Sequence, residues 1–407
     1  AGGEAEAVAR PLAPAFGLDL RAFTFVNHGA FGAALAQGEQ RAAAWRAYAE
    51  RQPLRHFDRT LFPHLVESTR RLAAFLGADV RNLALVQNAT AGLDAVISSV
   101  VRGAREDEGG ARRQVVFFDA AYGSVKRMAR RHAGAHAVEL PLPLPLAGDP
   151  AEVCAALEAH LARHAAQVAL VVVDHMTSNT ALVMPVDALA RLCRRHAVPL
   201  LVDGAHGPNA LPLDLAALPA DFYVGNCHKW LCSPKSVGFL HALPGRHALL
   251  APRVTSHGAS APFPAAFAWD GCRDYAPALA LPAVLDVWEA YGPARLRAHN
   301  AALAAYAAAM LAEALGTAHA GLDLAPPTSP FAAGPMRLVP LPAEGDSDAA
   351  FRLQEHLFQR AAIECPVKSV RGRLFLRISA HHYNRPAHYA RLADAVRDAL
   401  RGDLLAT

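Results

Sequence analysis

The chain has 407 residues, more than one compact hydrophobic core normally serves, so a small binding module is excluded and two packed units are expected. Apolar residues make up 53% and charged residues 19%, and no stretch reaches the roughly 18 uninterrupted apolar residues of a membrane span, so a soluble, folded protein is expected. With 40 basic against 36 acidic residues and no long block of like charge, nucleic-acid binding is not indicated.

Short apolar runs alternate with helical stretches such as 186–196, which predicts an α/β fold with a largely parallel sheet buried on both faces. Ligands of such sheets bind beyond the carboxyl ends of the strands. The strands are expected at 83–87, 114–119, 168–174, 199–203, 222–225 and 237–241.

A second, smaller pattern follows the breaker-rich segment 324–335, and the alanine-rich run at 301–312 reads as a packed helix. Strands at 336–340 and 373–379 and helices at 349–362 and 386–400 predict an α+β unit. We therefore expect an N-terminal extension (1–20), a large ligand-binding domain (21–285) whose first part packs on the small domain, and a small C-terminal domain (286–407).

The six cysteines are too scattered for a disulfide framework or a zinc finger, which indicates a reducing compartment, taken as the cytoplasm. The acidic opening 1–6 lacks an apolar core, so no secretory or mitochondrial leader is expected. No metal site is predicted, because His160 and His164 have helical spacing but no third ligand, and a solvated helix face is favoured.

Charged residues follow two neighbouring predicted strands. Asp203 ends one apolar strand and Lys229 follows the next, so their carboxylate and amine are expected to face one ligand. In 87–92 a strand turns into a helix, and the open N–H groups and helix dipole there suit a phosphate. Alternatively, Asn88 or Thr90 simply caps this helix.

Pyridoxal 5′-phosphate (PLP) needs these features together: a lysine for its aldehyde, an acid beside its ring nitrogen and an anion site for its phosphate. An aromatic ring stacked on the cofactor is the usual fourth part, and Tyr122 follows another predicted strand. Lys229 could instead be a surface lysine and Asp203 a turn residue. The cofactor interpretation is favoured because the chain has only four lysines and this one lies between His228 and Trp230.

Five segments in order resemble the class V aminotransferase family of fold-type I PLP-dependent enzymes. Within that family the chain is most similar to the branch of isopenicillin N epimerase-like proteins, C–S lyases and cysteine desulfurase relatives. The segments are 27–32 (Asn-His-Gly-Ala-Phe-Gly), 88–90 (Asn-Ala-Thr), 203–206 (Asp-Gly-Ala-His), 228–230 (His-Lys-Trp) and 377–384 (Arg-Ile-Ser, then Tyr-Asn). The resemblance runs from about residue 25 to 397 and implies a large domain with a mostly parallel sheet plus a smaller α+β domain.

The resemblance also implies roles for individual residues. Lys229 would form the Schiff base, Asp203 would pair with the pyridine nitrogen, and both would be catalytic together with Tyr122, which stacks on the ring. The remaining cofactor contacts implied are Asn88, Ala89, Thr90, His228 and His206 at the phosphate and Ser178 near the ring hydroxyl.

For the substrate, the resemblance implies that Arg377 clamps the α-carboxylate with a bidentate fork, alongside Asn27 and His28. A structural salt bridge is the alternative for Arg377.

Family members are homodimers, and the resemblance implies that the partner chain also touches the cofactor phosphate. Ser256, Gly271 and Cys272 lie in the segments expected to reach across. Relatives usually carry threonine at position 272, so a hydroxyl contact is in question here while the backbone N–H remains.

The expected reaction is PLP chemistry at the α-carbon of an amino acid, with the Lys229 amine as the base. A C–S lyase is preferred because elimination needs one base and a leaving group, and because such lyases are widespread in this branch. An amino-acid epimerase, a cysteine desulfurase or desulfhydrase and an aminotransferase remain alternatives, as does a catalytically silent homologue. Cys365 is expected to be a buried thiol, which disfavours persulfide chemistry.

Overall fold

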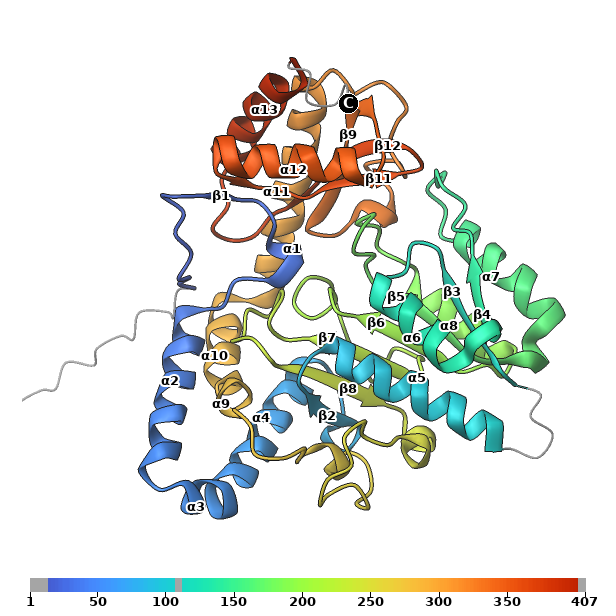
Figure 1. Ribbon diagram of the computed structural model, residues 1–407, viewed down its shortest axis with the longest axis vertical. Coiled ribbons are helices and arrows are strands. Elements are labelled where there is room, and N and C mark those ends of the chain that lie inside the picture. Colours follow the sequence, from blue (N-terminus) through green and yellow to red (C-terminus); the bar gives the residue numbers. More distant parts are fainter. Residues whose placement is uncertain (1–13, 107–111, 402–407) are drawn as a thin grey trace, which may run out of the picture.

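A computed structural model describes residues 14–106 and 112–401, and it shows a smaller unit above a larger one (Figure 1). Residues 1–13 of the predicted N-terminal extension lie outside the described residues. Within the described ranges, no helix is both long and apolar enough to cross a membrane.

The large unit contains the predicted sheet, which has seven strands in the order β2-β8-β7-β6-β5-β3-β4. The strands from β4 to β7 run parallel, while β8 is antiparallel to both of its neighbours. All six predicted strands of this unit are confirmed to within a residue or two at each end, and β4 was not predicted. Their bounds are β2 (Leu83–Val86), β3 (Gln114–Phe118), β4 (Ala137–Leu140), β5 (Val168–Asp174), β6 (Leu200–Gly204), β7 (Phe222–Asn226) and β8 (Gly238–Ala242).

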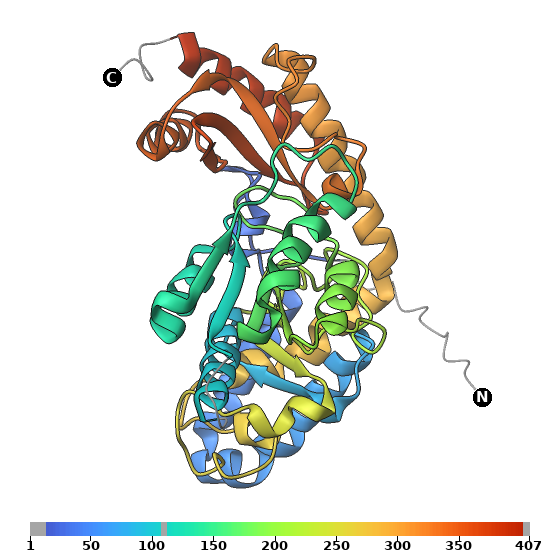
Figure 2. The same cartoon turned by 90° about the vertical axis from the view of Figure 1, so that its right-hand side faces the viewer.

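Helices cover both faces of this sheet (Figure 2). Alternate side chains of β3 point to the two faces of the sheet. Val115 and Phe117 pack in the core under α5 and α6. Val116 and Phe118 pack on the other face, in the core shared with α4, α7, α8 and α10. The helices of the unit are α2 (Ala36–Arg51), α3 (Pro53–Arg55), a π-helix (His56–Thr60), α4 (Leu61–Phe75), α5 (Ala89–Glu106), α6 (Gly123–Ala133), α7 (Ala151–His164), α8 (Val186–Arg195), α9 (Ala276–Leu279) and α10 (Leu281–Tyr291).

The small unit has a three-stranded antiparallel sheet in the order β11-β12-β9. Both predicted strands and both predicted helices are confirmed, although β9 extends four residues further than expected. The elements are β9 (Met336–Glu344), β11 (Val367–Val370), β12 (Arg373–Ser379), α12 (Ser347–Ala361) and α13 (Pro386–Arg401).

Two segments connect the units. The short strand β1 (Thr24–Phe25) pairs with β10 (Ile363–Glu364) of the small unit, and α1 (His28–Phe31) follows it at the junction (Figure 1). The long helix α11 (Pro293–Ala314) begins in the large core with Leu296 and ends in the small core from Ala304 onward. We therefore propose that the boundary between the domains falls within α11 rather than at residue 285.

Candidate active site

Three neighbouring strands carry acidic or basic side chains at or just beyond their carboxyl ends, on one edge of the large sheet. Asp174 ends β5, Asp203 lies near the end of β6, and Lys229 follows β7. Asp174 and Asp203 are direct partners in the parallel register, and both are buried. The sheet therefore places two carboxyl groups and one amine at the junction with the small unit, where ligands of such sheets bind.

The Lys229 amine is held in a poorly solvated position. Burial lowers its pKa from 10.5 to about 8, although Asp203 and Asp174 act against this shift. Lys229 Nζ lies 3.1 Å from Nε2 of the buried His206. The neutral amine is therefore accessible near physiological pH.

The tautomer of His206 strengthens this conclusion. The indole N–H of Trp230 can only donate, and it donates to His206 Nδ1 over 3.2 Å. Burial holds the pKa of His206 well below its usual range, so the ring is neutral and its single proton must lie on Nε2, facing Lys229. An N–H donor there favours the unprotonated amine of Lys229 as its acceptor. The structure thus places His206 at the amine, whereas we had expected it near the phosphate.

Asp174 is a functional candidate that the sequence interpretation missed. Burial raises the pKa of Asp174 well above its usual range, and the adjacent Asp203 raises it further, while a Tyr122 backbone N–H opposes the shift. Burial also raises the pKa of Asp203, but the Ala205 N–H, 3.0 Å from Oδ1, and Lys229 favour its ionised form. Two adjacent buried carboxyl groups do not both ionise readily, so we assign the negative charge to Asp203 and the proton to Asp174.

Arg377 on β12 reaches from the small unit into this site. Its Nη1 donates to the Ser178 carbonyl over 2.7 Å and to Ser178 Oγ over 3.3 Å, and its Nη2 donates to Asn27 Oδ1 over 3.0 Å. Burial lowers the Arg377 pKa to about 10, which leaves it a cation at neutral pH. No carboxylate in the described part of the chain pairs with it, so the salt-bridge alternative is wrong. Ser178 contacts this guanidinium, and its position near the cofactor ring hydroxyl stays a prediction.

Tyr122 lies at the mouth of the same site. Its side chain is 43% exposed, and it is close enough to Arg377 to influence the pKa of that guanidinium. A half-exposed ring at the edge of a binding site has a free face, and the stacking role of Tyr122 remains a proposal.

His28 contacts the backbone of Lys229. Its ring is fully buried, with Nδ1 2.9 Å from the Tyr383 hydroxyl and Nε2 3.1 Å from the Lys229 carbonyl oxygen. Both ring nitrogens therefore have partners within the chain, which supports the lysine loop, and the expected substrate contact of His28 stays a prediction. Gly32 lets the N-terminal segment approach the lysine loop closely. Its φ is +67°, and a Cβ there would lie 2.1 Å from the His228 carbonyl oxygen, so glycine is required at this position.

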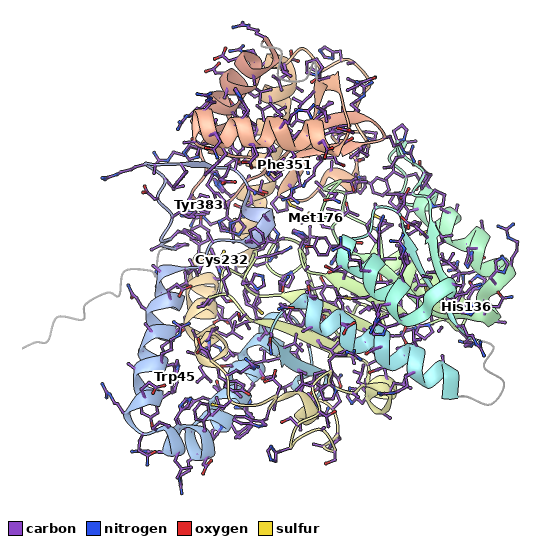
Figure 3. All side chains as sticks on the ribbon, in the orientation of Figure 1. Trp45, His136, Met176, Cys232, Phe351 and Tyr383 are labelled. Carbon is purple, nitrogen blue, oxygen red and sulfur yellow. The ribbon has the colours of Figure 1, made fainter. Side chains whose placement is uncertain are left out.

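The same histidine belongs to a buried cluster with Cys232 and His381 at the junction, where Figure 3 labels Cys232 and Tyr383. The thiol lies 3.7 Å and 3.6 Å from the two Nε2 atoms, distances that suit a metal site. The two imidazoles, however, stack with ring centroids 4.0 Å apart and planes only 16° apart. Imidazole lone pairs lie in the ring plane, so one ion cannot serve both stacked rings, and the cluster as it stands does not hold a metal.

The phosphate end of the expected cofactor site is partly closed by the protein itself. Asn88 Oδ1 accepts the Ala91 N–H over 2.9 Å, which confirms the capping alternative, and Asn226 Oδ1 accepts the Ala89 N–H over 2.8 Å. The first turn of α5 is therefore less open than expected, with the exposed Thr90 remaining available.

The buried polar atoms that lack a partner within the described residues include two on residues of the predicted site, Nδ1 of His228 and Nε of Arg377. Such unpaired buried polar atoms are costly unless a ligand satisfies them. The amine of Lys229 and the carboxylate of Asp203 fit the aldehyde and ring-nitrogen contacts that PLP requires, and Nε of Arg377 is left for a substrate carboxylate.

Three of the residues expected to act across a dimer are not brought to the lysine within one chain. Ser256, Gly271 and Cys272 form no hydrogen bond with Lys229, Asp203 or Asn88, and Cys272 is exposed. The segment of Gly271 and Cys272 contacts the end of β2 through a 2.8 Å hydrogen bond from Gln87 to Asp270. Their predicted role at a partner's phosphate stays a prediction.

Comparison with known proteins agrees with this geometry. The family model for class V aminotransferases matches residues 47–333. Isopenicillin N epimerase of Streptomyces clavuligerus is 33% identical, covering 93% of this chain and 95% of the relative. L-cysteine desulfhydrase of Arabidopsis thaliana is 28% identical, covering 93% and 88% respectively. A solved mutant structure of C-DES, with glycine covalently linked to its PLP cofactor, has a TM-score of 0.74 at 19% identity, covering 92% of this chain and 96% of that chain.

The fold and the lysine–aspartate site define a fold-type I PLP-dependent enzyme. The chain belongs to the class V aminotransferase family, as the sequence resemblance implied.

Proposed function

We propose that the protein is a PLP-dependent C–S lyase that eliminates a sulfur leaving group from the β-carbon of a cysteine-derived amino acid. The observation that carries this proposal is the single buried amine of Lys229, which His206 and Trp230 favour in its neutral form. Elimination needs one base at the α-carbon and a leaving group on the substrate, so one such amine is sufficient.

Each remaining residue supports one part of this reaction. When bound, PLP withdraws electrons from the substrate α-carbon. Asp203 supplies the negative charge for the cofactor ring nitrogen, and Lys229 takes the α-proton. Arg377 binds the substrate carboxylate through its unsatisfied Nε. The sulfur substituent departs with the electrons of its bond to the β-carbon, and hydrolysis of the product yields pyruvate and ammonia.

An amino-acid epimerase is the second candidate, supported by the 33% identity to an isopenicillin N epimerase. Epimerisation needs a second acid on the opposite side of the α-carbon, and the half-exposed Tyr122 near Arg377 is our candidate for it. A desulfurase that uses Cys365 is disfavoured, because that side chain is 1% exposed and burial raises its thiol pKa to about 12. The expected buried thiol is confirmed.

The test is incubation of the PLP-loaded protein with L-cysteine, S-alkylcysteines and their sulfoxides, with pyruvate and the released sulfur species measured together. Both products should form in equal amounts. Lys229→Ala should abolish the product and the visible absorbance of the cofactor, whereas Lys235→Ala should keep both. Inversion of the substrate without pyruvate would favour the epimerase, and a colourless, inactive parent protein would favour a silent homologue.

A further inference from the structure

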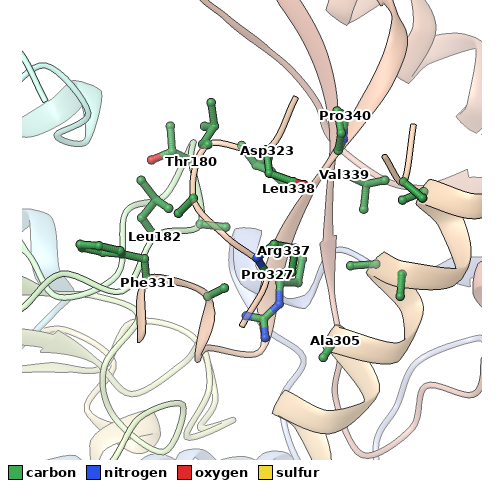
Figure 4. A pocket seen from close by; sticks show the side chains of 18 of the residues that line it. Thr180, Leu182, Ala305, Asp323, Pro327, Phe331, Arg337, Leu338, Val339 and Pro340 are labelled. Atoms are coloured by element: carbon green, nitrogen blue, oxygen red, sulfur yellow. The ribbon is translucent and has the colours of Figure 1, made fainter. Parts of the chain in front are cut away.

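A second cavity of about 240 Å³ lies between the two units, away from the lysine site (Figure 4). One wall is the alanine-rich face of α11, and another is β9, while the segment after β5 closes the side toward the large unit. No residue predicted for the cofactor or substrate lines it. The lining residues used below are Thr180, Ala305, Asp323, Phe331, Arg337 and Leu338.

Arg337 gives this cavity an uncompensated positive charge. Its Nη1 donates only to backbone carbonyl oxygens, at Gly334 over 2.9 Å and at Met336 over 3.4 Å. No carboxylate among the residues that the structure describes forms an ion pair with it. Burial lowers the Arg337 pKa to about 10, so the guanidinium is still charged at neutral pH. A desolvated cation without a counter-ion is costly, which makes the cavity a site for an anionic group.

Asp323 contributes the opposite charge to the same cavity. It forms no hydrogen bond or ion pair within residues 14–106 and 112–401, and Figure 4 shows its side chain separate from that of Arg337. Burial raises its pKa, as expected for a carboxyl group without a partner. The other acid of the lining, Glu313, is exposed and faces His319 at 3.6 Å, so Asp323 is the acid available to a ligand.

We propose that this cavity binds a small zwitterionic amino acid with a hydrocarbon side chain. Its carboxylate pairs with Arg337, its ammonium group pairs with Asp323, and its side chain contacts Phe331 and the alanine face of α11. A ligand with only one charge leaves either the cation or the carboxylate unpaired. The volume is below the roughly 300–1,000 Å³ of pockets that hold drug-sized ligands, so the occupant is small.

The cavity is distinct from the active site but shares two elements with it. Thr180 lies two residues beyond Ser178, which holds Arg377, and Leu338 on β9 is the strand partner of Arg377 on β12. A bound amino acid therefore touches both elements that position the substrate clamp. The site is suited to an effector that modulates substrate binding, and the coupling between the two sites must then be reciprocal.

The test uses the PLP-loaded protein and labelled 2-aminoisobutyrate, a small apolar amino acid without an α-hydrogen. Equilibrium dialysis measures the bound label per chain, while the absorbance of the cofactor reports separately on the active site. Arg337→Met and Asp323→Asn should each remove one equivalent of label and leave the absorbance response unchanged. Arg360→Met, an exposed arginine of the same unit, is the matched control and should bind as the parent does.

Two single-charge analogues test the zwitterion directly. Isobutyrate and isopropylamine should each bind at least about tenfold more weakly than 2-aminoisobutyrate, since each forfeits one charge-assisted contact. Thermal unfolding of every variant confirms folding, and Arg337→Lys should retain part of the binding because the positive charge persists. Equal label in the parent, Arg337→Met and Asp323→Asn overturns the proposal, as does isobutyrate binding as tightly as the amino acid. Neither result bears on lyase activity, which is assayed separately.

Discussion

The protonation of Lys229 decides how the protein takes up its cofactor, because only a neutral amine attacks an aldehyde. The amine is protonated below its pKa and neutral above it. The rate of PLP addition to the apoprotein should therefore rise as the pH passes through a midpoint no higher than about 8. Stopped-flow absorbance measures this rate.

Asp203→Asn provides an internal check on that profile. Asp203 raises the pKa of Lys229, so its neutralisation should move the midpoint to lower pH. A midpoint near the ordinary 10.5, unaffected by this change, would contradict the buried position of the amine.

The two buried carboxyl groups should respond differently to neutralisation. Asp203→Asn should lower activity by about 10²-fold, the usual loss when one preorganised electrostatic contact is removed. Asp174→Asn should cost much less, because we assign the shared proton to Asp174 and the amide can still accept from Tyr122. Turnover of the two purified variants at saturating PLP distinguishes them, and equal losses would show that the charge is not localised on Asp203.

The principal site residues could be predicted because they obey a rule about strand ends. Asp203 and Lys229 follow apolar strands, and Asp174 follows the same rule, so the sequence already held the signal for it. The tautomer of His206 could not be predicted, since it depends on the orientation of the Trp230 ring. The burial of His28 depends likewise on tertiary contacts with the distant Tyr383.

At the scale of elements, β12 carries the substrate clamp against two other segments. Arg377→Lys keeps the charge but cannot reach Ser178 and Asn27 together, because lysine lacks the planar fork. The KM for the amino-acid substrate should rise by about tenfold or more, with a smaller change in kcat. Initial-rate kinetics check this, and an unchanged KM would remove Arg377 from substrate binding.

Alanine substitutions at two glycines test the contact between the N-terminal segment and the lysine loop. Gly32 and Gly134 both have positive φ, so alanine at either should introduce strain of about 1–3 kcal/mol. Only Gly32→Ala also collides with the backbone at His228 and Lys229, because a Cβ at Gly134 meets nothing within 4 Å. Gly32→Ala should therefore lower the thermal midpoint more and weaken PLP binding, which calorimetry and cofactor titration measure. Equal effects would mean that the close approach is unimportant.

The strands that the sequence pattern did not predict are short and lie at sheet edges. β4 has no fully buried residue, and β11 has one. Partial exposure removes the continuous apolar signal that identified the central strands β5 and β6. The two-residue strands β1 and β10 exist only as partners of each other and leave no local pattern.

At the scale of the whole molecule, the predicted homodimer has a candidate surface on the large unit. Phe62 and Val66 on α4 are 41% and 53% exposed and lie beside the edge strand β2. Sedimentation should give twice the mass of one chain, and Val66→Glu should shift the protein toward monomer and loosen PLP, because we expect the partner's Cys272 segment to complete the site. Phe351→Glu, at an equally exposed position on the small unit, should do neither. A monomer with fully retained PLP would contradict the prediction.

The pairing of β1 with β10 brings the N-terminal segment against residues near the C-terminus, and this affects the order in which the protein folds during synthesis. Asn27 meets Arg377 across 350 residues of chain, and the ring of His28 meets Tyr383 across 355. A ribosome releases the N-terminus first, and the lysine loop emerges well before the strand that bears Arg377. A nascent chain can thus assemble the large sheet early, yet the catalytic pocket is completed only when nearly the whole polypeptide has been synthesised.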